Sequence, residues 1–462
     1  MLSLRAVAKH NDVATSHLTT LKSRVSIRCI QTATVTDGDI ARLAAKPLHP
    51  LTLADLCKHG RPPLSTDALL NSANFTLSIL PSRLAHRIQS LRSLPYIVVA
   101  NPNVNKIHNN YVHSLSTLIP YAEKKIETLE DEVHFTDAMA DLVQTHSNTI
   151  AVLAKGFLEA RKYISAKEVT DFLDEHLRAR IGTRLIAEQH IALHISSKPH
   201  AQWDNEDPHP QLKQRESSYI GVIDTSLRPA ALIRTCEATV GEICELKYGV
   251  RPTVKIIGSE EATIAHVPMH LEYVLTELLK NSFRATIEAG MEKEAVEVTI
   301  APAPANGFAY VNGGGTADGK EGQTISNYDQ GNVDAASGTD KTSRSASSNI
   351  RVVENGTPGV TIRIRDRGGG ISPDVLQKLW EYGFTTFNED EINDKVSGGQ
   401  GITALDVISG GAGGGSSLAG LGYGLPLGRA YAEYFGGGIA VQSLWGWGTD
   451  CYLTLRGVGR IP

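Results

Sequence analysis

The stretch "ELLKNSFRAT", Glu277 to Thr286, is the segment from which the fold can be predicted. Its leucines and alanine fall at the spacing of an amphipathic helix, so one side of the helix is expected to be buried. Glu277 and Asn281 are four residues apart, which places a carboxylate and an amide on one side of that helix. Such a pair can be a solvated helix edge, or it can be a general base beside a metal ligand. The stretch alone leaves both interpretations open.

Three glycine-containing motifs follow in order. "RIRDRGGGI" places Asp366 at the end of a predicted strand, where a carboxylate can accept a hydrogen bond from an exocyclic amine. "GLGYGLPLGRAYAEYFGG" begins at Gly420 and opens a helix, whose free N–H groups and dipole can hold phosphate. "GWGTD", 446–450, sets a small hydroxyl residue before a final strand. Each motif is weak alone, because glycine patterns recur by chance, but their joint order is specific.

In that order the motifs resemble the GHKL ATP-binding superfamily, whose nucleotide domain is the Bergerat fold. No GKS or GKT follows the glycines, and the motif set of ordinary protein kinases is missing. The resemblance implies that Asn281 coordinates Mg²⁺ on the ATP phosphates, that Glu277 is the general base and that Asp366 binds the adenine amino group. The remaining nucleotide contacts that it implies are Arg284, Gly368, Gly370, Thr385, Thr386, Gly420, Gly422, Tyr423, Gly424, Leu425 and Thr449.

A narrower resemblance extends from about residue 40 to the end. "THSNTIAVLAKGFLEARKYI" and "FLDEHLRARIGTRLIAEQH", together with the glycine motifs, are similar to the pyruvate dehydrogenase kinases and branched-chain 2-oxoacid dehydrogenase kinases. This implies a serine kinase of the mitochondrial matrix that phosphorylates and inactivates the E1α subunit of a 2-oxoacid dehydrogenase complex. Expected partners are E1α, the lipoyl domain of E2 and a second copy of the chain. A potassium ion is expected at Leu379, Glu381 and Phe384.

The predicted fold class is α + α/β. Apolar spacing predicts a four-helix bundle over 37–200, which would carry the lipoyl docking site, with Thr170 as the N-cap of its last helix. A polar link, 198–215, leads to a Bergerat-type α/β sandwich over 218–462, with helices at 228–247, 268–289 and 422–435. Two long segments without periodicity interrupt it: 303–349, interpreted as a disordered insertion, and 388–419, interpreted as the ATP lid.

Composition supports a soluble globular protein. The chain has 462 residues, 41% of them hydrophobic, and a net charge of −5, which gives no reason to expect nucleic acid as a partner. No apolar run is long enough to span a bilayer. Residues 1–31 contain five basic residues and one acid, Asp12, and are rich in serine and threonine. That pattern predicts a mitochondrial transit peptide, with a basic tail of no consequence as the alternative.

Several alternatives stay open at this stage. His146 falls where the family has a histidine once proposed to assist catalysis, so a histidine autokinase is one rival, although Ser147 rather than an acid follows it. A non-catalytic, ATP-gated scaffold for lipoyl domains is another. Tyr273 stands one turn before Glu277, where branched-chain kinases typically have tyrosine and pyruvate dehydrogenase kinases histidine. This favours the branched-chain complex without deciding between the two targets.

Overall fold

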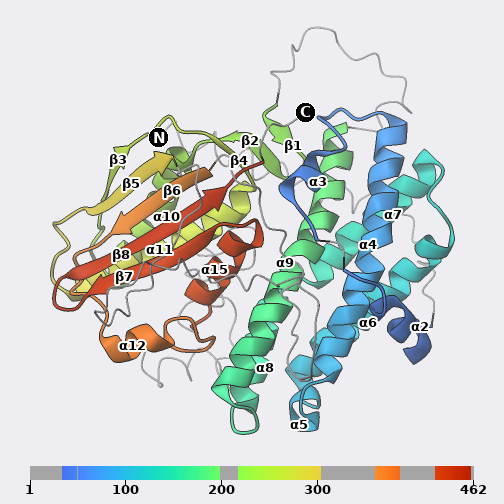
Figure 1. Cartoon of the computed structure of the whole chain (residues 1–462), viewed down its shortest axis with the longest axis horizontal. Coiled ribbons are helices and arrows are strands. Elements are labelled where there is room, and N and C mark those ends of the chain that lie inside the picture. Colours follow the sequence, from blue (N-terminus) through green and yellow to red (C-terminus); the bar gives the residue numbers. More distant parts are fainter. Residues whose placement is uncertain (1–33, 49, 198–216, 303–358, 386–421, 459–462) are drawn as a thin grey trace, which may run out of the picture.

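The structure, a computed structural model, describes residues 34–48, 50–197, 217–302, 359–385 and 422–458 (Figure 1). The predicted transit peptide (1–31), the link (198–215), the insertion (303–349) and the lid (388–419) lie outside the described residues. So do Thr386 and Gly420.

The N-terminal half is helical, as predicted. Its four long helices are α4 (Thr66–Arg92), α6 (Pro102–Glu123), α7 (Leu129–Thr145) and α9 (Ala166–Ser197). The shorter ones are α2 (Asp37–Ala44), α3 (Leu53–Cys57), α5 (Tyr96–Val99) and α8 (Thr149–Ala160). Side chains of Ser65, Asn101 and Thr128 cap α4, α6 and α7 by accepting hydrogen bonds from first-turn N–H groups, which explains where these helices begin.

The start of α9 differs from the prediction. The helix begins at Ala166, and Ser165 makes the reciprocal capping bonds: its hydroxyl accepts from the Glu168 N–H, and Glu168 Oε2 accepts from the Ser165 N–H. The prediction of Thr170 as N-cap is therefore wrong, because the S-x-x-E motif that begins five residues upstream, at Ser165, is the stronger start signal. The Thr170 hydroxyl is released for a contact outside the helix.

The C-terminal half contains a five-stranded sheet in the order β3-β5-β6-β8-β7. The strands are β3 (Val254–Gly258), β5 (Val296–Pro302), β6 (Gly359–Arg365), β7 (Gly438–Leu444) and β8 (Gly448–Arg456). Only β3 and β5 pair in parallel. A small sheet of β1 (Tyr219–Ile220), β2 (Ile223–Leu227) and β4 (Ile264–His266) joins it to the bundle side. Neither β4 nor β7 was predicted, since both are short apolar runs next to glycine or proline.

Three helices pack against the large sheet: α10 (Pro229–Tyr248), α11 (Pro268–Glu288) and α15 (Gly424–Tyr434). A fourth, α12 (Pro373–Lys378), lies at one end of the sheet in Figure 1. Figure 1 also shows α15 between the sheet and α9 of the bundle, and both contacts are extensive. The apolar core of the bundle continues into α15 through Leu427, Ala430 and Tyr434, so this core crosses the predicted domain boundary.

Candidate active site

The helix α11 carries the carboxylate and the amide that the sequence singles out. Glu277 is largely covered, with 13% of its side chain exposed, whereas Asn281 is exposed. Leu275, Leu278 and Leu279 on the opposite side are buried in the core beneath the sheet. Lys280 donates to Glu277 Oε1 at 2.6 Å, a contact that the sequence analysis missed although its i, i+3 spacing indicates it.

Asp366 follows β6 and is buried against β8. Its Oδ1 accepts hydrogen bonds from the N–H groups of Gly368 (2.9 Å) and Thr449 (3.3 Å). Burial raises the pKa of the Asp366 carboxyl, and these bonds and one with Ser282 oppose that rise. A carboxylate held in this way can accept a hydrogen bond from a ligand that enters beside it.

The glycines after Asp366 bring this loop against its neighbours. A Cβ on Gly368 would lie 2.4 Å from the Cβ of Ala285 on α11, so the close approach requires glycine. Gly370 has a φ of +76°, and a Cβ there would lie 2.3 Å from the Leu444 carbonyl oxygen. The loop therefore spans from α11 to the β7–β8 turn.

The second glycine motif, described from Gly422 onwards, also contacts α11. Gly422 adopts a φ of +75° and Tyr423 is buried at the start of α15. A Cβ on Gly424 would lie 2.1 Å from Glu277 Oε2. The first turn of an eleven-residue helix thus lies directly against the carboxylate of Glu277, with N–H groups that can bind phosphate.

The other predicted nucleotide and potassium ligands among the described residues lie on α11, on α15 and in the loop after α12. Arg284 Nε donates to Glu288 Oε1 at 2.6 Å along α11. Leu425 packs against the sheet core from α15. Leu379, Glu381, Phe384 and Thr385 share the loop after α12, where the Glu381 carbonyl accepts from the Phe384 N–H at 3.3 Å. Their assignment to potassium or nucleotide stays a prediction.

Tyr273 lies one turn before Glu277 on α11. Its hydroxyl is buried and has no hydrogen-bond partner among the described residues. Desolvation raises its pKa well above the usual value, and the neighbouring Glu277 charge adds to this effect. The ring packs on Tyr431 of α15, with centroids 5.2 Å apart. Tyr273 is therefore a neutral phenol beside the carboxylate.

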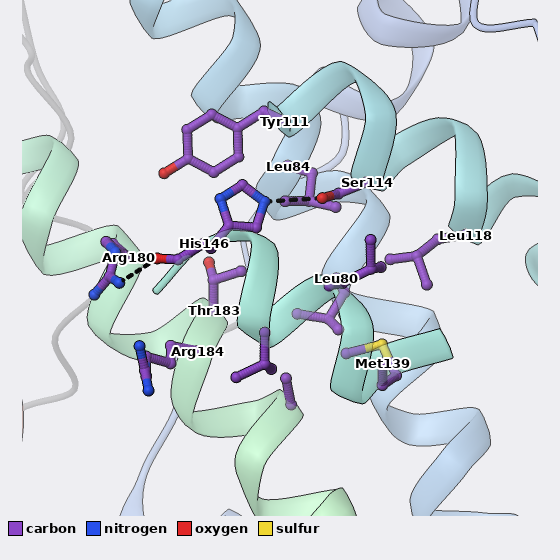
Figure 2. A pocket seen from close by; sticks show the side chains of 13 residues that line it. Leu80, Leu84, Tyr111, Ser114, Leu118, Met139, His146, Arg180, Thr183 and Arg184 are labelled. Carbon is purple, nitrogen blue, oxygen red and sulfur yellow. Dashed lines mark hydrogen bonds between the residues drawn. The ribbon is translucent and has the colours of Figure 1, made fainter. Parts of the chain in front are cut away.

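His146 lies elsewhere, at the C-terminal end of α7 in the bundle. Figure 2 shows its ring facing Ser114 on α6, with Nε2 2.8 Å from that hydroxyl, while its carbonyl accepts from Arg180 at 2.8 Å. The ring stacks on Tyr111 and lines a largely apolar cavity of about 60 Å³. Desolvation, with Arg180 nearby, lowers the His146 pKa to about 4. Because its Nε2 is engaged by Ser114 and its ring stacks on Tyr111 within the bundle, His146 is poorly placed to accept a phosphoryl group.

The structure thus brings together residues from four sequence motifs that are separated in the chain. They are Glu277, Asp366, Gly368, Gly370, Gly422, Gly424 and Thr449. Ser443 was missed: its hydroxyl accepts from the Ile371 N–H at 2.6 Å and fixes the loop after Asp366. Nothing in the sequence marks a lone serine in a strand for that role. Along the described parts of the chain, no helix is long and apolar enough to cross a membrane.

Comparisons with known proteins agree with this geometry. A family model described as mitochondrial branched-chain alpha-ketoacid dehydrogenase kinase matches residues 50–224. The chain is 27% identical over 421 residues to pyruvate dehydrogenase (acetyl-transferring) kinase 1, mitochondrial, of Saccharomyces cerevisiae, covering 90% of this chain and 86% of the relative. It is 28% identical over 412 residues to the mitochondrial pyruvate dehydrogenase (acetyl-transferring) kinase of Arabidopsis thaliana, covering 88% and 90%.

The structure joins a helical bundle to a sheet, and the helices against the sheet carry a carboxylate, an amide and glycine loops. This is the architecture of the GHKL class, with a Bergerat-type ATP domain. The similarity to the yeast and plant enzymes runs through both halves of the fold. The chain is therefore similar, over most of its length, to the mitochondrial pyruvate and branched-chain 2-oxoacid dehydrogenase kinases.

Proposed function

We propose that this chain is a serine kinase of the mitochondrial matrix that phosphorylates the E1α subunit of a 2-oxoacid dehydrogenase complex and thereby inactivates it. The observation that carries the proposal is the contact of Gly424 with the carboxylate of Glu277. It joins a helix N-terminus that can bind phosphate to the one largely covered carboxylate of the predicted motif. A base beside the phosphates is the arrangement that phosphoryl transfer requires.

Each residue then has a distinct task. Glu277 accepts the proton of the attacking serine hydroxyl, and Lys280 holds one of its oxygens at 2.6 Å. Asp366, buried and fixed by the N–H groups of Gly368 and Thr449, accepts from the adenine amino group. The N–H groups at the start of α15 bind the phosphates. Gly368, Gly370 and Gly422 allow the close backbone approaches that build the site, because a Cβ at each would clash with protein atoms.

The proposal requires a magnesium ion, and the residues present fit one. Asn281 is an exposed residue, and its i, i+4 spacing places it on the same side of α11 as Glu277. Magnesium in phosphoryl-transfer sites is bound by one or two protein ligands together with substrate phosphates, so a single amide is sufficient here. When bound, the ion would neutralise charge on the phosphate oxygens. A potassium ion at Leu379, Glu381 and Phe384 belongs to the same proposal.

The target complex is one of two. The family model that matches the N-terminal half is that of the branched-chain enzyme, and Tyr273 supports the same choice. The named relatives act on pyruvate dehydrogenase. Docking of the E2 lipoyl domain on the bundle, homodimerisation and removal of residues 1–31 as a transit peptide complete the proposal.

The test is phosphate transfer from labelled MgATP to purified pyruvate and branched-chain dehydrogenase complexes in parallel, with each dehydrogenase activity followed. Label on one E1α with falling activity would establish both kinase and target. Glu277→Gln should keep MgATP binding and reduce transfer about 100-fold or more. Glu272→Gln, on the same helix but outside the site, is the matched control. Transfer at the wild-type rate by Glu277→Gln would contradict the role of the base.

Two rivals predict other results in the same experiment. A histidine autokinase would carry acid-labile phosphate on the chain itself, and the engagement of His146 Nε2 by Ser114 and of its ring by Tyr111 argues against that site. If the chain were a scaffold without catalysis, its Glu277→Ala variant would inhibit the complex as well as the wild type does.

A further inference from the structure

A hydrogen bond connects the bundle to loop 379–385, which lies between α12 and the end of the described segment. The Tyr382 N–H donates to the Thr170 hydroxyl oxygen at 3.2 Å. Tyr382 is 5% exposed, so this N–H lies in a covered position where an unmade hydrogen bond is costly. Thr170 can accept the bond because Ser165, and not Thr170, caps α9.

The other side of the same loop holds the phosphate-facing chain. The Gly383 N–H donates to the Gly422 carbonyl at 3.2 Å. A Cβ on Gly422 would lie 2.2 Å from the Phe384 carbonyl oxygen, so the two chains are in direct contact. The rings of Tyr382 and Tyr423 pack with centroids 5.5 Å apart. Loop 379–385 is therefore enclosed between α9 and the segment Gly422–Gly424.

Further contacts keep α9 and α15 in fixed relation around this loop. Arg178 on α9 pairs with both Asp174 and Glu433, and Glu433 belongs to α15. The Arg429 guanidinium of α15 lies 4.6 Å from the ring centroid of Trp380 in the loop. Within this arrangement of α9 and α15, the Thr170 hydroxyl adds a direct hydrogen bond from α9 to the loop backbone.

We propose that Thr170 is a positioning residue for the nucleotide. Its hydroxyl fixes the Tyr382 N–H, the loop fixes Gly422 to Gly424, and Gly424 lies against Glu277. A residue of the helical bundle thus sets the geometry of the phosphate-binding turn from outside the site. The proposal rests on the proposed function, since it assumes that this turn binds the phosphates of MgATP.

The test compares three variants of the full chain by calorimetric titration with MgATP and by steady-state kinetics. Thr170→Val keeps the branched shape and removes the acceptor, whereas Thr170→Ser keeps the acceptor. Thr239→Val is the matched control, because Thr239 is a half-buried helical threonine, like Thr170, and its hydroxyl donates to the Thr235 carbonyl of its own helix.

Thr170→Val should weaken MgATP affinity about three- to tenfold, the range for one lost hydrogen bond, and raise KM for ATP more than it lowers kcat. Thr170→Ser should restore most of the affinity, and Thr239→Val should match the wild type. Circular dichroism of each variant at the assay temperature shows whether it is folded.

Wild-type affinity in Thr170→Val would overturn the inference. Equal weakening in Thr170→Ser and Thr170→Val would do the same, because packing rather than the acceptor would then be responsible. Affinity does not depend on the protein substrate. A wild type that binds MgATP but phosphorylates neither complex would contradict the proposed function, while the Thr170 comparison would still decide this inference.

Discussion

Gly424 of α15 and Glu277 of α11 are in such close contact that a Cβ on Gly424 would lie 2.1 Å from the carboxylate oxygen. The backbone of one helix start is therefore packed against the side chain that the proposed chemistry needs. Since no real Cβ tolerates that distance, any side chain at 424 must displace either the phosphate-facing turn or the carboxylate.

Gly424→Ala is expected to reduce kcat/KM at least about tenfold, because a misplaced base or phosphate-binding turn affects transition-state positioning directly. Gly428→Ala, one turn along α15, is the matched control: its added methyl would meet no atom closer than 3.8 Å. The measurement is initial-rate kinetics with MgATP and the dehydrogenase complex that the wild-type enzyme phosphorylates. Equal rates for the two variants would show that the contact with Glu277 does not matter.

Asp366→Asn should lower MgATP affinity about tenfold or more, since it weakens a charge-assisted hydrogen bond to the adenine. The same change should stabilise the protein without nucleotide at neutral pH. The folded-state pKa of this carboxyl is raised by burial, so its ionised form costs stability once the pH exceeds that pKa.

The direction of this change in the free energy of unfolding can be tested by denaturant unfolding at several pH values without nucleotide. The stability advantage of Asp366→Asn over the wild type should be greatest at neutral pH and should shrink as the pH falls through the folded pKa, where the wild-type carboxyl becomes protonated. A variant that is less stable than the wild type at neutral pH would show that the hydrogen bonds of Asp366 outweigh its desolvation.

Much of this site follows from the sequence, for identifiable reasons. The i, i+4 spacing of Glu277 and Asn281, the strand before Asp366 and the glycines opening α15 are local patterns, and the structure has each element where the pattern predicts it. The helical bundle follows equally from apolar periodicity.

What the sequence could not supply is which segments meet across the fold. The contact between Thr170 and Tyr382 joins residues 212 positions apart, and neither residue type marks it. The shared core of the bundle and α15 was missed for the same reason, because periodicity identifies a buried side but not its partner. The start of α9 was misplaced because Thr170 and Ser165 are both acceptable caps, and only the bond with Glu168 decides between them.

Arg178→Met is expected to destabilise the chain by about 1–3 kcal/mol, because it leaves Asp174 and Glu433 with only the more distant Arg429 as a common cation at the junction of bundle and ATP domain. The charges of these two residues raise the pKa of the Arg178 guanidinium, so it stays ionised at any working pH. Unfolding of Arg178→Met, Glu433→Gln and the double variant forms a double-mutant cycle. Additive effects would mean that the pair is not coupled.

The last prediction concerns the loss of stability at acidic pH. His190, His266 and His270 are buried, and desolvation lowers their pKa values to about 4, 4 and 3. In the unfolded chain they take up protons near pH 6.5, so stability is lost as the pH falls from 6.5 towards 4, by about 1 kcal/mol per histidine at pH 5.5. His270→Phe should reduce this loss, since the His270 ring already packs between Tyr431 and Phe435 and its Nδ1 has no partner among the described residues.

The control is His134→Phe, because His134 is exposed on α7. Unfolding free energies at pH 7.5 and 5.5 decide the matter: if His270→Phe loses as much stability on acidification as His134→Phe, protonation of the buried ring is not the cause.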